Sequence, residues 1–380
     1  NNNENKVLNV PHLRFPEFNG EWETKLINDL AVVIGGGTPD TTIKSYWDGE
    51  IQWFTPSEIG KNKYVDSSLR TITEEGLNNS SAKLLPPNTI LLSSRATIGE
   101  CSLSLRECAT NQGFQSLVSK KCYVDFLYYL IQTKKRDLIR KSCGSTFLEI
   151  SANEVRKIQV SVPTDVEQQK IAGLLSLIDE RIATQNKIIE DLKKLKSAIS
   201  LKMLHSDSWE QFKIQDIASI GRGRVISSVE ISQQENPLYP VYSSQTSNDG
   251  IMGYLDDFMF EGEYISWTTD GANAGTVFYR NGKFNCTNVC GLLKLKKGFD
   301  AHFVSLVLAE ATRMYVSTNL ANPKLMNNTM GNIQIRLPKL EEQKRISVVF
   351  RKLHGLLETH NSLIIKYSKQ KQYLLSQMFI

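Results

Sequence analysis

The sequence contains fragments of catalytic motifs but no complete one. The stretch GGGTPDTT from Gly35 lacks the Gly-Lys-[Ser/Thr] ending that grips nucleotide phosphates, which favours a glycine-rich turn after a strand. The stretch NPLY from Asn236 is one residue away from the Asn-Pro-Pro-Tyr of amino-methyltransferases, but no glycine-rich methyl-donor loop precedes it. The five histidines are scattered, and Asp256 and Asp257 lie in a polar turn without a metal-binding partner. We therefore predict no catalytic residues, no metal and no cofactor in this chain.

Polar side chains that suit nucleic-acid recognition are plentiful on predicted loops. Arginine reads guanine, and asparagine or glutamine reads adenine, through paired hydrogen bonds, while lysine and arginine also hold phosphates. For any one residue a solvated or turn-capping role is commoner, so only the whole set points to DNA. The net charge of +5 is compatible with this partner and is also common among unrelated proteins. The candidate DNA-binding residues are Lys44, Arg95, Asn111, Gln112, Gln115, Lys120, Lys121, Arg222, Arg224, Gln245, Asn273, Arg280, Lys283 and Asn288.

The cysteines and the lack of long apolar runs lead us to expect a cytoplasmic protein. The six cysteines form no C-x-x-C pair, and even the closest two, Cys286 and Cys290, lack two further ligands for a metal. Free thiols in a reducing compartment are the expected state. No run reaches the 18 apolar residues of a membrane span, and the polar start NNNENKV is unlike a secretory signal.

The elements that must position the polar candidates come from an internal repeat. Residues 163–203 and 338–378 align without gaps at an offset of 175, and ten of the 41 positions are identical. Upstream, WETKLINDLA from Trp22 matches WEQFKIQDIA from Trp209. Between these anchors the two halves diverge. A repeat of this kind predicts one scaffold used twice, with a different task in each middle.

Each repeated segment predicts one long helix, the first over Val166–Met203, with Thr164 and Glu167 as a capping box. Apolar residues follow a coiled-coil spacing. The stripe is interrupted twice at equivalent positions, by Gln185 or His360 and by Lys196 or Lys371. The chain order requires the two helices to run antiparallel if their stripes meet; separate packing on two globular cores is the alternative. The predicted coiled-coil residues are Ile171, Leu175, Ile178, Ile182, Ile189, Leu192, Ile346, Phe350, Leu353, Leu357, Ile364 and Leu374.

The predicted fold class is α+β, with two similar mixed α/β domains separated by two long antiparallel helices and related by a pseudo-two-fold axis. Short strand-like runs alternate with turn residues in both middles, and helical stretches are expected at Phe126–Lys141 and Ala301–Tyr315. The predicted segments are a leader (1–21), a first domain (22–162), a first spacer helix (163–206), a second domain (207–337) and a second spacer helix (338–380).

The whole chain resembles the specificity subunit of type I restriction–modification systems. The resemblance rests on PHLRFPEFNGEW (Pro11–Trp22), GGGTPDTTIKSYWDGEIQWFTPSEI (Gly35–Ile59), SSRATIGECSL with ATNQGF (Ser93–Phe114), and the twin segments EQQKIAGLLSLID and EEQKRISVVFRKL. The second helix departs from the first at His354-Gly355, where the first has Asp179-Glu180.

The resemblance implies that each domain is a target recognition domain reading one half of a bipartite, asymmetric site in double-stranded DNA. It also implies that the helices set the gap between the halves and dock two methyltransferase subunits, with restriction subunits as further partners. Methyl donor, ATP and Mg would then belong to those partners. Two alternatives stay open: a non-DNA scaffold with a coiled-coil spacer, and a methyltransferase or nuclease in its own right.

Overall fold

The computed structural model describes residues 8–144, 148–317 and 322–380, so the predicted leader is described from residue 8 onward. The chain forms two compact units, each of which contains part of both long helices. Unit 1 comprises residues 1–188 and 360–380, and unit 2 comprises residues 189–359. The predicted domain boundaries are linear along the chain, whereas the compact units each combine two separate helix segments with one globular domain.

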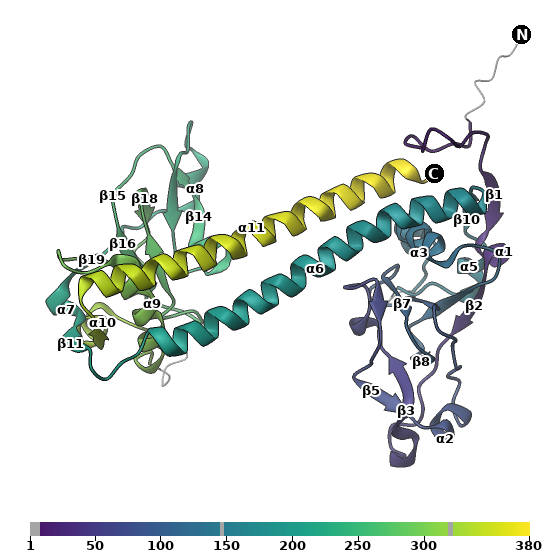
Figure 1. Ribbon diagram of the computed structural model, residues 1–380, viewed down its shortest axis with the longest axis horizontal. Coiled ribbons are helices and arrows are strands. Elements are labelled where there is room, and N and C mark those ends of the chain that lie inside the picture. Colours follow the sequence, from purple (N-terminus) through teal and green to yellow (C-terminus); the bar gives the residue numbers. More distant parts are fainter. Residues whose placement is uncertain (1–7, 145–147, 318–321) are drawn as a thin grey trace, which may run out of the picture. The chain divides into compact units, whose positions relative to one another are not determined.

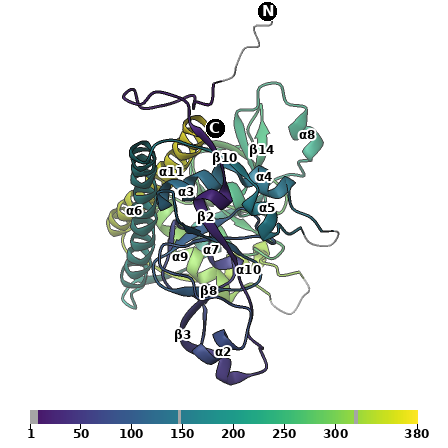
Figure 2. The ribbon, with the colours of Figure 1, turned by 90° about the vertical axis from the view of Figure 1, so that its right-hand side faces the viewer.

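Unit 1 contains two sheets and a separate strand pair. The larger sheet has the order β2-β9-β6-β7-β4, with β2 at Ala31–Gly35, β9 at Gln115–Ser119, β6 at Ile90–Leu92, β7 at Cys101–Ser104 and β4 at Tyr64–Val65. The smaller sheet has the order β5-β3-β8, with β5 at Arg70–Ile72, β3 at Trp47–Phe54 and β8 at Cys108–Thr110. The smaller sheet and α2 (Glu74–Asn78) lie at the end of the unit away from β10 (Gln159–Val162) (Figures 1 and 2).

Unit 2 repeats this plan with two four-stranded sheets. The first has the order β12-β19-β16-β17, with β12 at Ala218–Arg222, β19 at Cys290–Leu295, β16 at Tyr264–Thr268 and β17 at Val277–Arg280. The second has the order β14-β13-β18-β15, with β14 at Ile251–Leu255, β13 at Tyr239–Tyr242, β18 at Lys283–Cys286 and β15 at Phe260–Glu261.

Short helices complete both units. In unit 1 they are α1 at Ile27–Leu30, α3 at Val124–Thr133, α4 at Lys135–Arg140 and α5 at Ala152–Arg156. In unit 2 they are α7 at Ile214–Ile217, α8 at Ser228–Ser232, α9 at Ala301–Ala311 and α10 at Asn327–Asn332. The helical stretch predicted at Phe126–Lys141 is divided into α3 and α4, and the one at Ala301–Tyr315 ends as a 3-10 turn over Thr312–Met314.

A two-stranded pair closes each globular domain where the chain enters and leaves it. In unit 1, β1 (Glu23–Leu26) pairs antiparallel with β10, and Glu23 lies opposite Val162. In unit 2, β11 (Glu210–Lys213) pairs with β20 (Gln334–Leu337), and Glu210 lies opposite Leu337. Because both pairs share the same register, the two middles begin and end in the same local frame despite their different sequences.

The two long helices are α6 (Asp165–Met203) and α11 (Leu340–Met378). Within unit 1, early residues of α6 such as Leu175 share a core with late residues of α11 such as Leu374. Further along, the ring Nδ1 of His360 lies 2.5 Å from Oε1 of Gln185. Within unit 2, Ile199 of α6 packs against the core that contains Ile346 of α11. In each unit the two helices therefore run antiparallel, as expected from chain order. All the predicted coiled-coil residues are buried or half-buried.

The first turn of α6 carries a contact that the sequence does not reveal. Glu167, predicted as part of a capping box, is 1% exposed. Its carboxylate accepts hydrogen bonds of 2.7 Å from Nε and Nη2 of Arg14 and one of 3.3 Å from Nε1 of Trp22. The leader is thus fixed to the start of α6 by a buried ion pair.

Candidate nucleic-acid interface

Three of the unit 1 candidates, Arg95, Asn111 and Gln112, lie on two neighbouring loops. The backbone N–H of Ser94 donates to the carbonyl of Gly113 over 2.8 Å, which holds the two loops side by side. Asn111 caps its own loop, because its Oδ1 accepts from the Gly113 N–H at 2.9 Å. The side chain of Arg95 is 41% exposed and is paired with Glu149 at 2.5 Å. These loops present one arginine and two amides in a single patch, and the arginine is held by a carboxylate that a DNA contact would have to replace.

The glycine-rich stretch beside this patch is a packing feature. A Cβ at Gly36 would lie 2.0 Å from the carbonyl oxygen of Asn111, so only glycine permits the approach. The N–H of Gly37 donates to the carbonyl of Thr110 at 2.8 Å, and the hydroxyl of Thr38 donates to Oε1 of Gln112. The stretch therefore positions the candidate loop. Thr38 belongs to the patch although it is not among the residues predicted from sequence; its position directly after three glycines is the sequence feature that points to it.

The remaining unit 1 candidates lie elsewhere. Gln115 begins β9, and its Oε1 is buried without a hydrogen-bond partner among the described residues. Lys120 and Lys121 are exposed at the other end of β9, because Gln115 is paired with Gly35 whereas Ser119 is paired with Ala31. Four residues of strand separate these ends by about 13 Å. Lys44 is exposed in a 3-10 turn over Lys44–Tyr46.

In unit 2, Arg222, Arg224 and Asn288 are brought together at the end of β12. Nη1 of Arg222 donates to the carbonyl of Asn288 at 3.5 Å, and its Nε donates to Oδ1 of Asn327 at 2.9 Å. The backbone N–H of Arg224 donates to the carbonyl of Cys286 at 3.1 Å.

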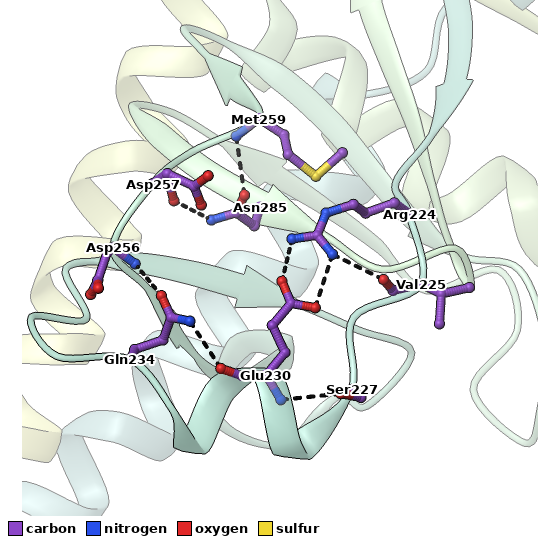
Figure 3. A network of polar contacts seen from close by, with 9 residues as sticks. All are labelled: Arg224, Val225, Ser227, Glu230, Gln234, Asp256, Asp257, Met259 and Asn285. Atoms are coloured by element: carbon purple, nitrogen blue, oxygen red, sulfur yellow. Dashed lines mark hydrogen bonds and ion pairs between the residues drawn. The ribbon is translucent and has the colours of Figure 1, made fainter.

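Arg224 is tied into a local network that Figure 3 shows. Its Nη1 lies 2.9 Å from Oε2 of Glu230, and its Nη2 contacts the other carboxylate oxygen (Figure 3). This pairing raises the pKa of Arg224 and lowers the pKa of Glu230. The neighbouring Gln234 bridges α8 to the turn at Asp256, with hydrogen bonds of 2.9 Å at both ends. The loop that carries Arg224 is therefore well ordered by polar contacts.

The other unit 2 candidates differ in exposure. Lys283 and Asn288 are exposed at the two ends of the β18 region, and Asn273 is exposed in the turn between β16 and β17. Nε2 of Gln245 donates to the carbonyl of Ile251. Arg280 is 5% exposed and does not lie on the outer surface. The candidates thus do not form one continuous surface within this unit.

The described cysteines, histidines and acidic residues form no disulfide and no cluster of metal ligands. Among these described residues, no three His, Cys, Asp or Glu side chains gather as metal ligands. All six cysteines are free, and burial raises the pKa of the Cys101 and Cys108 thiols to about 12. Thiols with so high a pKa are poor nucleophiles at neutral pH. Of the described helices, none has the length and apolar character to cross a bilayer.

The lowered pKa of His302 in α9 leads us to expect that the stability of unit 2 depends on pH. Burial, then the charge of Arg351, lowers the pKa of His302 to about 4, while an unfolded histidine titrates near about 6.5. Below about 6.5 the unfolded chain takes up a proton that the folded chain refuses, so stability falls as the pH drops from about 6.5 to about 4. We expect the melting temperature of His302→Gln to fall less than that of the wild type between pH 7.5 and pH 5. Equal falls in the two proteins would contradict the assignment.

Comparison with known proteins identifies the family. A family model described as type I restriction modification DNA specificity domain matches residues 19–194 and again residues 206–366. The chain belongs to this family. The two matches coincide with the two halves of the repeat, so each half carries one specificity domain.

Relatives agree with this assignment. The specificity subunit of the type I restriction enzyme MjaIX from Methanocaldococcus jannaschii is 39% identical over 180 residues, which cover 46% of this chain and 42% of that protein. A putative type I specificity subunit of Mycoplasma pneumoniae, S.MpnORF201P, is 36% identical over 231 residues, covering 59% of this chain and 96% of that protein. The first match therefore spans less than half of the relative's length, whereas the second spans almost all of it.

A solved structure supports the fold. The crystal structure of the type I S subunit from M. genitalium superposes with a TM-score of 0.70 at 18% identity, covering 98% of this chain and 99% of that one. The predicted fold class, two mixed α/β domains with two long helices, is confirmed. The predicted family is also confirmed, and neither a non-DNA scaffold nor a stand-alone methyltransferase or nuclease is supported by these matches.

Proposed function

We propose that this chain supplies the DNA sequence specificity of a type I restriction–modification complex. Each specificity domain reads one half of a bipartite, asymmetric target in double-stranded DNA. The observation that carries this proposal is that the two domains share the same closing strand pair but carry different candidate side chains on their loops. The strand pairs β1–β10 and β11–β20 have the same register, yet the candidate patches are Arg95 with two amides in one unit and Arg222 with Arg224 in the other. Two domains with the same scaffold and different loops are suited to reading two different half-sites.

The long helices have the role of a spacer in this proposal. Their buried stripe joins α6 to α11 within each unit, and their exposed faces carry charged residues suited to partner subunits. Helix length would then set the gap between the half-sites. Two methyltransferase subunits would dock on the helices, with restriction subunits completing the complex in the cytoplasm. The chain itself is proposed to be non-catalytic, because methyl donor, ATP and Mg would be bound by these partners.

The direct test is to produce the chain together with type I methyltransferase subunits and to map the methylated bases in host DNA. We expect one asymmetric sequence made of two half-sites with a fixed gap between them. The chain purified alone should transfer no methyl groups to the same DNA. Methylation by the chain alone, or a single uninterrupted site, would contradict the proposal.

A further inference from the structure

The two units differ where α9 and α11 meet, and unit 2 has a large cavity there. Two contacts establish the correspondence between α3 of unit 1 and α9 of unit 2. Oε1 of Gln168 accepts from the N–H of Tyr123 at 2.9 Å, and Oε1 of Gln343 accepts from the N–H of Asp300 at 3.0 Å. Positions on α3 and α9 therefore correspond at an offset of 177, while positions on the long helices correspond at 175.

In unit 1 two tyrosines occupy part of this place and its charges are paired, and the pocket that remains beside Asp179 has a volume of only about 270 Å³. Tyr129 of α3 is fully buried, and its hydroxyl donates to Oδ2 of Asp179 at 2.7 Å. Nζ of Lys371 lies 2.8 Å from the other oxygen of Asp179. Tyr128 packs beside Tyr129 with ring centroids 5.0 Å apart. Burial raises the pKa of both phenols, which keeps them neutral.

Unit 2 has lost the filling side chains and the carboxylate. Ser305 and Leu306 stand at the positions of Tyr128 and Tyr129, and His354 stands where unit 1 has Asp179. Lys196, the counterpart of Lys371, remains. The cavity here has a volume of about 710 Å³, against about 270 Å³ for the pocket at the equivalent place in unit 1, and it lies between α9, α11 and the outer end of β17. Gly355 in its wall has nothing within 4 Å of the Cβ position, so the cavity is open there. The cavity therefore lies where the second helix has His354-Gly355 and the first helix has Asp179-Glu180.

Arg280 is the buried cation of this cavity. It is 5% exposed, and its Nε donates to Oγ of Ser266 at 3.0 Å. Its guanidinium lies 3.6 Å from the ring centroid of Tyr242 and 4.4 Å from that of Phe278. The rings and the serine fix the guanidinium; among the described residues no carboxylate forms an ion pair with it, although Asp249 in the same wall attracts it from farther away. A buried cation that has no directly paired carboxylate favours the binding of an anion beside it.

The other groups in the wall add positive charge. Lys196 and Arg351 line the cavity with Arg280, against Asp249 and Glu358. Arg351 has one distant acidic neighbour, Glu263 at 3.7 Å. His302, whose pKa is lowered, is neutral near pH 7 and lies 2.8 Å from Oγ of Ser347 through Nδ1. Glu358 lies 3.3 Å from the ring of His354 on the same helix. Cations therefore outnumber carboxylates around the cavity.

We propose that this cavity of unit 2 binds a phosphate group, with Arg280 as the principal contact and Lys196 and Arg351 as supporting charges. The guanidinium fork suits the paired oxygens of a phosphate, and the volume admits a nucleotide-sized anion. The phosphate can belong to a free nucleotide or to a DNA strand. Only the second source rests on the proposed function.

The test measures binding of inorganic phosphate and of AMP to the full chain by calorimetry, alongside the affinity for target DNA. We expect Arg280→Gln to weaken the phosphate-bearing ligand about tenfold or more, the usual effect of losing a charged hydrogen bond. His354→Asp restores the carboxylate of unit 1 beside Lys196 at a residue whose side chain is 60% exposed, and is therefore expected to fold and to weaken binding too. The matched control is Arg140→Gln in unit 1, whose side chain is 77% exposed.

The results distinguish a free nucleotide from a DNA strand as the source of the phosphate, and they test the cavity separately from the proposed function. Binding of phosphate or AMP that both cavity variants weaken would identify a nucleotide site. No binding of either, with DNA affinity lowered by both cavity variants, would identify a DNA phosphate. If folded Arg280→Gln and His354→Asp change neither measurement, the proposal is wrong. If the wild type binds no DNA, the proposed function fails, while the titrations with free phosphate and AMP still test the cavity.

Discussion

Replacing Glu23–Val162 with the matching segment of another family member will change one half of the DNA target and leave the other half intact. The structure gives the reason for these boundaries: Glu23 and Val162 lie opposite each other at the end of the β1–β10 pair. A grafted segment therefore enters and leaves through one strand pair. Each wrong base pair costs about 1–3 kcal/mol in a specific complex, so an original half-site with about three or more wrong base pairs should lose methylation about a hundredfold or more. Sequencing of methylated host DNA provides the measurement.

The reciprocal replacement is the matched control. Residues 210–337 are bounded by the equivalent pair, Glu210 and Leu337, and exchanging them should change only the other half-site. The gap should stay constant in both chimeras, because neither exchange alters α6 or α11. A chimera that changes both half-sites, or that changes neither while remaining assembled, would show that the two domains are not independent readers.

Glu167→Ala will lower the free energy of unfolding of unit 1 by about 3 kcal/mol. The carboxylate of Glu167 is 1% exposed and accepts from Arg14 and Trp22. Its loss leaves a largely buried guanidinium without its counterion. The matched variant is Glu342→Ala, at the same position of the repeat in unit 2. Glu342 is exposed at the start of α11, so its loss should cost only about 0.5 kcal/mol through the helix dipole.

Hydrogen exchange of the full chain in increasing urea separates the two units and measures both variants. The double variant Arg14→Ala/Glu167→Ala removes both buried charges, and we expect it to be less destabilised than the sum of the single changes. Equal effects of Glu167→Ala and Glu342→Ala would mean that burial of the ion pair contributes nothing to the stability of unit 1.

The long helices and their pairing could be predicted because the same apolar spacing occurs in both copies of the repeat. The apolar spacing predicted both helices, and chain order predicted their antiparallel direction. The polar interruptions at Gln185 and His360 were visible as matching breaks in the stripes. Their contact with each other was not visible in the sequence. Equivalent residues that touch are the signature of a two-fold interface, so the two breaks form one feature of the paired helices.

The residues of the site were less predictable, because residue type does not reveal burial or local partners. Arg280 and Arg224 look alike in sequence, yet Arg280 is buried under two aromatic rings while Arg224 is paired with Glu230. The DNA-binding assignments remain predictions for this reason. The cavity of unit 2 could not be predicted at all, since it depends on which α9 side chains face α11.

The discontinuous composition of unit 1 has a consequence for biosynthesis. Its core includes Leu374, Met378 and Phe379, and Phe379 contacts the rings of Trp22 and Phe126. A ribosome makes these three residues only after the whole of unit 2, residues 189–359. At about 5–20 residues per second, the apolar face of the nascent first unit waits roughly 10–40 s for its missing helix. Unit 2 is contiguous and can fold during that interval, so chaperones that bind exposed apolar segments have their main opportunity on the unit that is translated first.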